Sequence, residues 1–428
     1  MRSNRLVCAA LLLGAGLRAQ TLLPPITVTP STIPADTDAT KVTITGYGFT
    51  PNLSVQWNGE PRPTQYLGPG TLQVTLTADD LALPALGTLA VWDPAQQTAV
   101  SDIAAILVYL PIQNNDLLYD SLRNRIYVAV SKQQLARGPS IAVLNPETAR
   151  IERWYPVDAD PEKLALSADG RYLYAALGNF VRRIDLLTWT ADLDIPLATD
   201  QFFGERHVYT MTVLPQTNTS LAVSFRIPGL SPPYVGTAIF DGARMRSKLT
   251  PGHDGPANLI GGPNDAILYA SDGVGTFYVL KLDASGVAVA QSLPLLCGAD
   301  GDPVLSNGLI YTGWGAAIDP AGPSPINTFG SAGLIRPIPD QQTVLILGGD
   351  SPPGYYIGFN PYRLSLIDAI SGIKIWSLPL PVHLDRNRGP LIRWGINGIA
   401  LRDYSDFSPS GRVYLFRANL TRAGGPLP

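Results

Sequence analysis

The fold is decided by the stretch Asp169-Gly170-Arg171-Tyr172-Leu173-Tyr174-Ala175-Ala176, a turn followed by a short strand-like run of small and aromatic residues. The stretch Arg123-Asn124-Arg125-Ile126-Tyr127-Val128-Ala129 carries the same pattern. Weaker copies follow, and the first apolar residues of the seven copies are Ile126, Leu173, Leu221, Leu268, Ile310, Leu345 and Ile399. A period of roughly 40 to 50 residues that contains only strands predicts a β-propeller. We therefore predict a seven-bladed β-propeller over residues 105–421.

A second repeated element predicts the third strand of a blade. It is an apolar run that ends in Asp or Asn before a turn. These side chains can cap the turn through a local hydrogen bond, so we interpret them as structural rather than metal-binding. The residues at this position are Asn145, Asp185, Asp283 and Asp368.

The last repeat offers only three strand candidates, whereas Ile106 to Leu110 is a spare strand before the first repeat. We predict that this strand pairs antiparallel beside Arg412 to Phe416 and forms the outer strand of the last blade. This pairing would close the ring and remove an open edge, although the outer strand itself would then be an edge.

Residues 22–104 carry a different pattern, in which Thr and Val alternate with a period of two. That pattern predicts half-buried antiparallel strands, and about 80 residues of them make a small β-sandwich. Asn58-Gly59 predicts a two-residue hairpin, because both positions favour positive φ. We expect this segment to fold separately from the propeller, as a fragment of residues 20–104. The strand candidates are 27–29, 41–45, 53–57, 71–76 and 88–92.

Both parts resemble known families. Thr45-Gly46-Tyr47-Gly48-Phe49-Thr50-Pro51 and Val55-Gln56-Trp57-Asn58-Gly59 resemble signature phrases of the IPT/TIG family, which implies an Ig-like sandwich over residues 22–104. Asp169 to Tyr174 and Ile141 to Pro146 resemble the YVTN-type propeller repeats, which are also found fused to IPT/TIG-like domains in exported bacterial proteins. The second resemblance implies a propeller and leaves its activity open, because propellers serve many functions.

The first 19 residues have a basic start, an apolar run from Leu6 to Leu17 and a small residue at Ala19. This pattern predicts a signal peptide that is cleaved after Ala19, and the apolar run is too short to span a bilayer comfortably. Cleavage would take the formal charge from −3 to −6. A mildly acidic chain without basic runs argues against nucleic acid as a partner. We therefore expect a secreted, periplasmic or cell-surface protein with no transmembrane segment after cleavage.

Residue types that carry catalysis are sparse. The three histidines, His207, His253 and His383, lack metal-ligand spacing, and we interpret them as loop or surface residues. Cys297 is the one cysteine left after cleavage, and we interpret it as a buried blade residue. We interpret the Asp-x-Asp pairs as structural turns, with calcium binding as the alternative. These pairs are Asp158/Asp160, Asp192/Asp194 and Asp300/Asp302. The sequence predicts no metal site and no cofactor.

The innermost strand of each predicted blade should line a central channel, and these strands begin near Asp116, Lys163, Thr210, Asn258, Asp302, Ile335 and Arg393. The candidate ligand-binding residues at the channel mouth are Asp116, Lys163, Asn258, Asp302 and Arg393. The segments 225–235 and 348–362 interrupt the repeat, and insertions of this kind can line a binding site.

The leading hypothesis is an exported binding or scaffold protein, with an unknown protein or carbohydrate ligand and an Ig-like spacer or adhesion module. The alternative is a propeller enzyme, lactonase- or lyase-like or quinoprotein-like, acting at the channel. An enzyme of that kind needs several polar residues that converge on the channel, commonly with a metal or a quinone. The inner strands contain no His and few acids, so we do not expect an enzyme.

Overall fold

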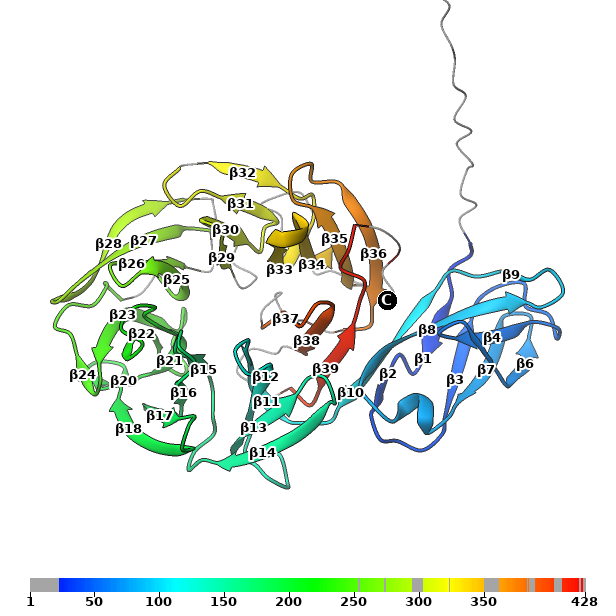
Figure 1. Ribbon diagram of the computed structural model, residues 1–428, viewed down its shortest axis with the longest axis horizontal. Helices are drawn as coiled ribbons and strands as arrows, with labels where there is room; N and C mark the ends of the chain where they lie inside the picture. The colour runs from blue at the N-terminus through cyan, green and yellow to red at the C-terminus, as the bar shows by residue number, and fades with distance from the viewer. Residues whose placement is uncertain are drawn as a thin grey trace, which may run out of the picture.

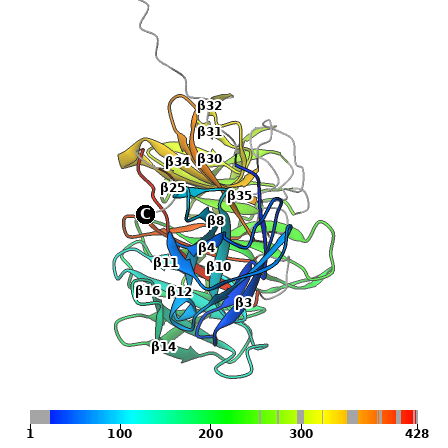
Figure 2. The same cartoon turned by 90° about the vertical axis from the view of Figure 1, so that its right-hand side faces the viewer.

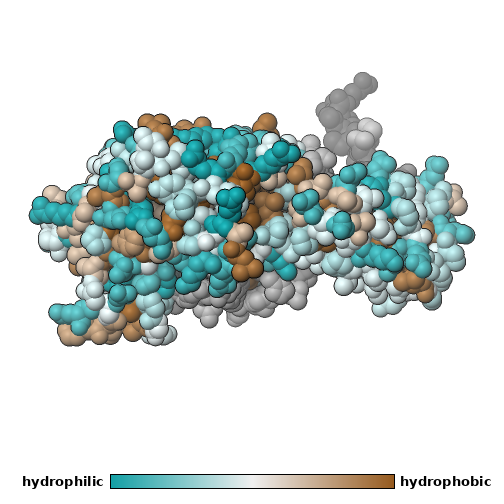
Figure 3. Space-filling model, turned by 90° about the horizontal axis from the view of Figure 1, so that it is seen from below, coloured by the Kyte–Doolittle hydropathy of each residue, from teal (hydrophilic) through white to brown (hydrophobic). Residues whose placement is uncertain are grey.

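The computed structural model describes residues 23–252, 255–272, 275–294, 303–322, 324–349, 362–382, 384, 389–403, 410–422 and 425. Within these ranges the chain is all-β, with 3₁₀ turns as its helical elements. A ring of sheets stands beside a smaller β-sandwich (Figure 1). The view turned by 90° places the sandwich in front of the ring (Figure 2). Seen from below, the ring and the sandwich lie side by side, and hydrophilic and hydrophobic residues are interspersed over this face (Figure 3). The predicted signal peptide lies outside the described residues. No helix among the described residues is long and apolar enough to cross a membrane.

The sandwich packs two sheets around an apolar core. All five predicted strands are present, and the predicted Asn58-Gly59 hairpin is confirmed, with φ of +50° and +85°. Alternating residues such as Val42, Ile44 and Trp57 fill the core, because successive side chains of a strand point to opposite faces. One sheet has the order β1 (Thr27–Thr29), β3 (Thr40–Thr45), β7 (Thr71–Leu76) and β6 (Thr64–Gly68). The other contains β8 (Ala85–Asp93), β4 (Ser54–Trp57), β5 (Glu60–Arg62), β9 (Thr98–Ala99) and β2 (Thr32–Pro34).

The ring is a seven-bladed β-propeller, counted over the described residues. Each blade is a four-stranded antiparallel sheet. In the first six blades the innermost strand comes first in the chain, whereas the last blade takes its outermost strand from before the first blade. The first three blades are β11 (Asn114–Asp120), β12 (Arg125–Val130), β13 (Ser140–Asn145), β14 (Arg150–Pro156); β15 (Leu164–Leu166), β16 (Tyr172–Ala176), β17 (Phe180–Asp185), β18 (Thr190–Pro196); and β21 (His207–Val213), β22 (Ser220–Arg226), β23 (Tyr234–Asp241), β24 (Arg244–Met245). A short hairpin, β19 (Thr199–Asp200) and β20 (Gly204–Glu205), connects the second blade to the third.

The other blades complete the ring. They are β25 (Asn258–Asn264), β26 (Ile267–Ser271), β27 (Phe277–Asp283), β28 (Gly286–Leu293); β29 (Val304–Ser306), β30 (Leu309–Thr312), β31 (Ala316–Ile318), β32 (Pro325–Thr328); β33 (Ala332–Ile338), β34 (Thr343–Gly349), β35 (Tyr362–Asp368), β36 (Lys374–Leu380); and β37 (Ile392–Trp394), β38 (Gly398–Arg402), β39 (Val413–Arg417), β10 (Ala104–Leu110). All seven residues that mark the sequence repeat lie in the second strand of their blade.

The predicted turn caps are confirmed. The Asn145 and Asp185 side chains accept hydrogen bonds from the backbone N–H groups two residues later, at 3.0 and 2.8 Å. Asp283 and Asp368 do the same, at 2.7 and 3.0 Å. An acidic or amide side chain at this position satisfies backbone donors that the turn would otherwise leave unpaired.

Strand β10 belongs to both parts of the molecule. Its residues Tyr109 and Leu110 pair antiparallel with Tyr414 and Val413 of β39, which confirms the predicted closing pair. Upstream, β10 pairs antiparallel with β8 over Ala104 to Val108 and parallel with β2 over Leu107 to Tyr109. The predicted boundary between residues 104 and 105 therefore falls at the start of the strand that the sandwich and the ring share.

The side chains of β10 alternate between two cores. Ile106 and Val108 are buried in the core of the sandwich. Ala105 and Leu107 are buried in a second cluster, which the last two blades of the ring provide. The prediction that this strand is an exposed edge is wrong, because Leu107 and Val108 each have a partner in β2 and another in β8.

Two further predictions need correction. Asp192 and Asp194 lie in strand β18 rather than in a turn, where they pair with Arg183 and Arg182 at 2.9 and 2.8 Å. The predicted insertion 225–235 is shorter than expected, because β22 continues to Arg226 and β23 begins at Tyr234. Of the predicted insertion 348–362, residues 348–349 and 362 belong to strands, and 350–361 lie outside the described residues.

Candidate functional site

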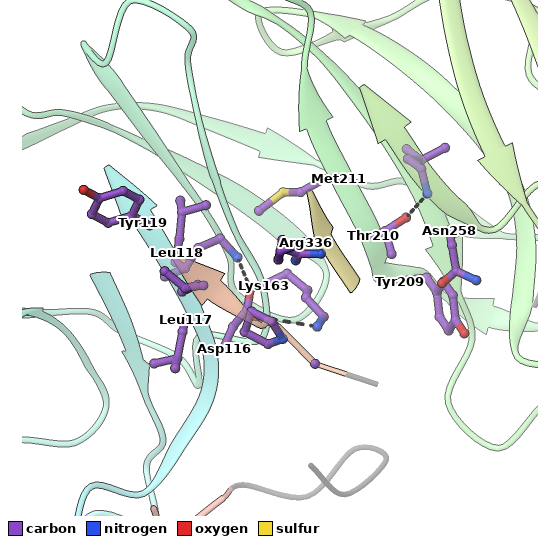
Figure 4. A pocket seen from close by; sticks show the side chains of 15 residues that line it. Asp116, Leu117, Leu118, Tyr119, Lys163, Tyr209, Thr210, Met211, Asn258 and Arg336 are labelled. Atoms are coloured by element: carbon purple, nitrogen blue, oxygen red, sulfur yellow. Dashed lines mark hydrogen bonds and ion pairs between the residues drawn. The ribbon is translucent and has the colours of Figure 1, made fainter. Parts of the chain in front are cut away.

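A cavity of about 280 Å³ lies in the central channel of the propeller. The first strands of several blades supply its walls, because the innermost strand of every blade faces the axis of the ring. Figure 4 shows Lys163 and Arg336 between Asp116 on one side and Tyr209 and Asn258 on the other. The polar side chains that line it are Asp116 and Tyr119 on β11, Lys163 just before β15, Tyr209 and Thr210 on β21, Asn258 on β25 and Arg336 on β33.

Asp116 connects the first blade to the second. Its Oδ2 accepts a hydrogen bond from the backbone N–H of Leu164 at 3.0 Å, and its Oδ1 lies 3.8 Å from the Lys163 Nζ. The Asp116 side chain is 11% exposed and the Lys163 side chain 31%. The carboxylate therefore has a structural role between blades, while the ammonium group remains accessible from the cavity.

Thr210 connects the third and fourth blades in the same way. Its Oγ1 donates to the carbonyl of Ala257 at 2.7 Å and accepts from the N–H of Leu259 at 3.0 Å. Asn258, between those two residues, donates from Nδ2 to Ser271 Oγ at 3.3 Å. These bonds fix the inner strands relative to one another, so the cavity wall is organised before any ligand enters.

Three of the five predicted site residues, Asp116, Lys163 and Asn258, line this cavity together. Asp302 lies outside the described residues. Arg393 is on the inner strand β37, but its neighbour Ile392 lines the cavity in its place. Burial lowers the pKa of Arg393, and the Arg393 Nε has no hydrogen-bond partner within the described part of the chain.

Sequence reasoning missed Tyr209 and Arg336 as lining residues. Arg336 donates from one guanidinium nitrogen to the carbonyl of Ile335 at 2.7 Å. The repeat predicts an inner strand that begins near Ile335, but it does not indicate that the Arg336 side chain lines the channel. Tyr209 lies at a register shift between Val208 and Thr210, which changes the direction of the side chains there.

The interpretation of His207 as a loop or surface residue is wrong, and so is the expectation that the inner strands contain no His, because His207 belongs to the inner strand β21. It is the first residue of β21, and its Nδ1 lies 3.0 Å from Glu162 Oε1. The other carboxylate oxygen of Glu162 lies 3.0 Å from Arg226, which pairs with His207 across β21 and β22. The His207 side chain is 19% exposed, and these contacts through Glu162 hold the loop before Lys163 against the third blade.

Asp160 accepts hydrogen bonds from Asn115 Nδ2 at 3.1 Å and from the N–H of Lys132 at 2.9 Å, so it acts as a structural acceptor. His253, Cys297, Asp300 and His383 lie outside the described residues. Among the residues that the structure describes, no group of three or more His, Cys, Asp or Glu side chains could hold a metal ion.

Comparison with known proteins supports the N-terminal part. The IPT/TIG domain model matches residues 26–102, so this segment is an IPT/TIG domain. No match was found among curated proteins.

Several solved structures are similar to the chain at low identity. Dihydro-heme d1 dehydrogenase NirN in complex with DHE is 15% identical over 68% of this chain and 71% of that chain, with a TM-score of 0.40. Hydrazine synthase of Kuenenia stuttgartiensis is 13% identical over 68% and 76%, with a TM-score of 0.35. Hsv2 of Kluyveromyces lactis is 10% identical over 68% and 90%, with a TM-score of 0.46. These values are too low to indicate a shared activity.

Proposed function

We propose that this chain is an exported binding protein whose YVTN-type propeller binds a small polar ligand in its central channel, while the IPT/TIG domain acts as a spacer or adhesion module. One observation carries the proposal. The inner strands bring Lys163, Tyr209, Asn258 and Arg336 from different blades to one cavity. A concave site with a few convergent polar groups is the usual form of a small-molecule site, and about 280 Å³ is near the lower end of the common size range.

The wall chemistry favours a ligand that carries hydroxyl and carboxylate groups. Lys163 offers an ammonium group, Asn258 an amide and Tyr209 a ring with a hydroxyl. Asp116 and Thr210 form hydrogen bonds between neighbouring blades, so they shape the cavity and are not assigned to ligand binding. A sugar acid satisfies a cation, an amide and an aromatic ring at once. We therefore choose glucuronate and galacturonate as probes, with glucose and galactose as their neutral counterparts.

The proposal predicts that a sugar acid raises the melting temperature and binds in calorimetry, and that Lys163→Met weakens this binding about tenfold or more. The reason is the loss of a charge-assisted hydrogen bond, which contributes roughly 1.5–3 kcal/mol. Lys132→Met is the matched control, because Lys132 is exposed and does not line the cavity. Equal affinities for the two variants, or no binding by any of the four sugars, would argue against the site.

Export is the second element of the proposal, and the basic start and apolar run of the first 19 residues support it. If the leader is processed as predicted, mass spectrometry of the mature protein should find Gln20 as the first residue. An intact Met1 in exported material, or a lipid on Cys8, would contradict this prediction.

A further inference from the structure

The outer strands of the described blades differ in how they are protected against pairing with another chain. A blade's outer strand presents unpaired N–H and C=O groups, and natural proteins protect such edges with charges, prolines, short length or a cover. β14 carries Arg150, Glu152, Arg153 and Pro156; β18 carries Asp192, Asp194 and Pro196; β24 has two residues; β32 begins with Pro325; β36 carries Lys374 and Pro379; and β10 is covered by β2.

Strand β28 lacks the charge, the proline and the short length that protect the other outer strands, and only its beginning is covered. A register shift places a β-bulge at Ala290, and the outer strands β14, β18, β32 and β36 contain a bulge of the same kind. Its eight residues, Gly-Val-Ala-Val-Ala-Gln-Ser-Leu, include no charge and no proline. The five consecutive residues from Ala288 to Ser292 are all exposed, and Val289 is 37% exposed. Consecutive exposure means that both faces of this part of the strand are accessible to solvent.

Only the beginning of β28 is covered. The N–H of Val287 donates to the carbonyl of Lys248 at 3.2 Å, and Gly286 forms a parallel bridge with Lys248. Beyond Val287 no described strand pairs with its outer side. Charged residues flank this stretch, because Lys281 of the neighbouring strand β27 lies opposite Ala288 and Lys248 lies beside Gly286. The open edge is therefore an uncharged stretch of about six residues.

We propose that two copies of this chain associate through β28, which pairs antiparallel with β28 of the second copy about a two-fold axis. Backbone pairing would join two four-stranded blades into one sheet of eight strands, within the size range of natural sheets. An antiparallel strand pair is self-complementary, so the assembly closes as a dimer.

Charge and position both favour a second copy as the occupant. Self-pairing of β18 would bring Asp192 and Asp194 close to their own copies, whereas β28 has no side chain that repels itself. The small side chains of Ala288, Ala290 and Ser292 allow two blades to approach closely. β28 lies on the rim of the ring opposite the sandwich, so two copies can meet there with their IPT/TIG domains at the far ends (Figure 1).

Sedimentation velocity of the mature chain tests this proposal. The protein concentration should run from about 1 to 100 µM, because a dimer with a micromolar dissociation constant dissociates in this range. The wild type should shift from monomer to dimer as concentration rises. Val289→Lys should weaken the dimer at least about tenfold, because it places like charges near the axis. Ala191→Lys, an exposed position on the charged strand β18, should leave the dimer unchanged. A monomeric wild type, or a dimer that Val289→Lys leaves intact, would overturn the proposal.

Cysteine crosslinking tests the pairing directly and does not depend on stability. In a Cys297→Ser background, single cysteines replace Ala288, Ala290 or Ser292. Because a residue on the two-fold axis faces its own copy, one position near the centre of β28 should form an intermolecular disulfide most efficiently. A cysteine at Ala191 serves as the control. Equal crosslinking at Ala191, or none along β28, would refute pairing through this strand.

Discussion

Replacing Val108 by proline is expected to destabilise the sandwich and the propeller together, by about 3 kcal/mol or more. Val108 is fully buried, and it pairs with Ile33 on one side and Ala85 on the other. The N–H of Val108 points either toward β2 or toward β8, and both of these strands pair with β10. Proline therefore removes a hydrogen bond of the sheet in either case. From the sequence, a smaller loss of stability was possible if Val108 lay on an open edge of the sheet. The structure excludes this, because β2 pairs with β10 at this position.

Calorimetry of the full mature chain measures this effect, because both unfolding transitions should move to lower temperature. Ile103→Pro is the control. Ile103 is exposed, it precedes β10, and its N–H bonds to the side chain of Asp102. We expect Ile103→Pro to lower the free energy of unfolding by less than about 1 kcal/mol, which is the net contribution of a typical hydrogen bond. A Val108→Pro variant in which one transition moves and the other stays would show that β10 does not couple the two parts.

Fragments of the sandwich that end before and after β10 should behave very differently. A fragment of residues 20–104 lacks Ile106 and Val108, whose side chains are buried in the sandwich core. Each buried side chain of this size contributes roughly 1.5–3 kcal/mol, so their joint loss approaches the whole stability of a small domain. The structure thus revises the expectation that residues 20–104 fold alone.

We expect the 20–104 fragment to be largely unfolded, whereas a fragment of residues 20–111 should give a β-type circular dichroism spectrum and a cooperative melt. Leu107→Ser in the longer fragment is a useful control, because Leu107 packs in the propeller cluster rather than in the sandwich core. Equal melting temperatures for the 20–104 and 20–111 fragments would contradict the assignment of β10 to the sandwich.

The repeat could be predicted because it depends on local signals. Stretches such as Asp169 to Ala176 combine a turn with a short apolar strand, and both follow from neighbouring residues. The shared strand could not be predicted in full. Residues 104–110 are apolar at nearly every position, which indicates burial on both faces, but the pattern does not say which elements cover each face.

The candidate site was predicted in part for a similar reason. The positions of Asp116, Lys163 and Asn258 in the repeat place them at the start of inner strands, and a cavity does lie there. Register shifts occur between Asn114 and Asp116 and between Val208 and Thr210. Each shift changes which side chains face the channel, so simple alternation along the strand fails at these points. The second shift explains why Tyr209 emerged only from the structure, whereas Arg336 lies on β33, whose pairing with β34 is regular.

The shared strand also has a consequence for the order of folding. During synthesis the sandwich emerges first, and it contains the strand that the ring needs last. Asn114 and Ser410, which bond across the closing seam, are 296 residues apart in the chain. Contacts over such distances form slowly, because a large loop entropy must be overcome first. A folded sandwich holds β10 extended between β2 and β8 throughout this time, so the nascent ring closes on a template that is already in place.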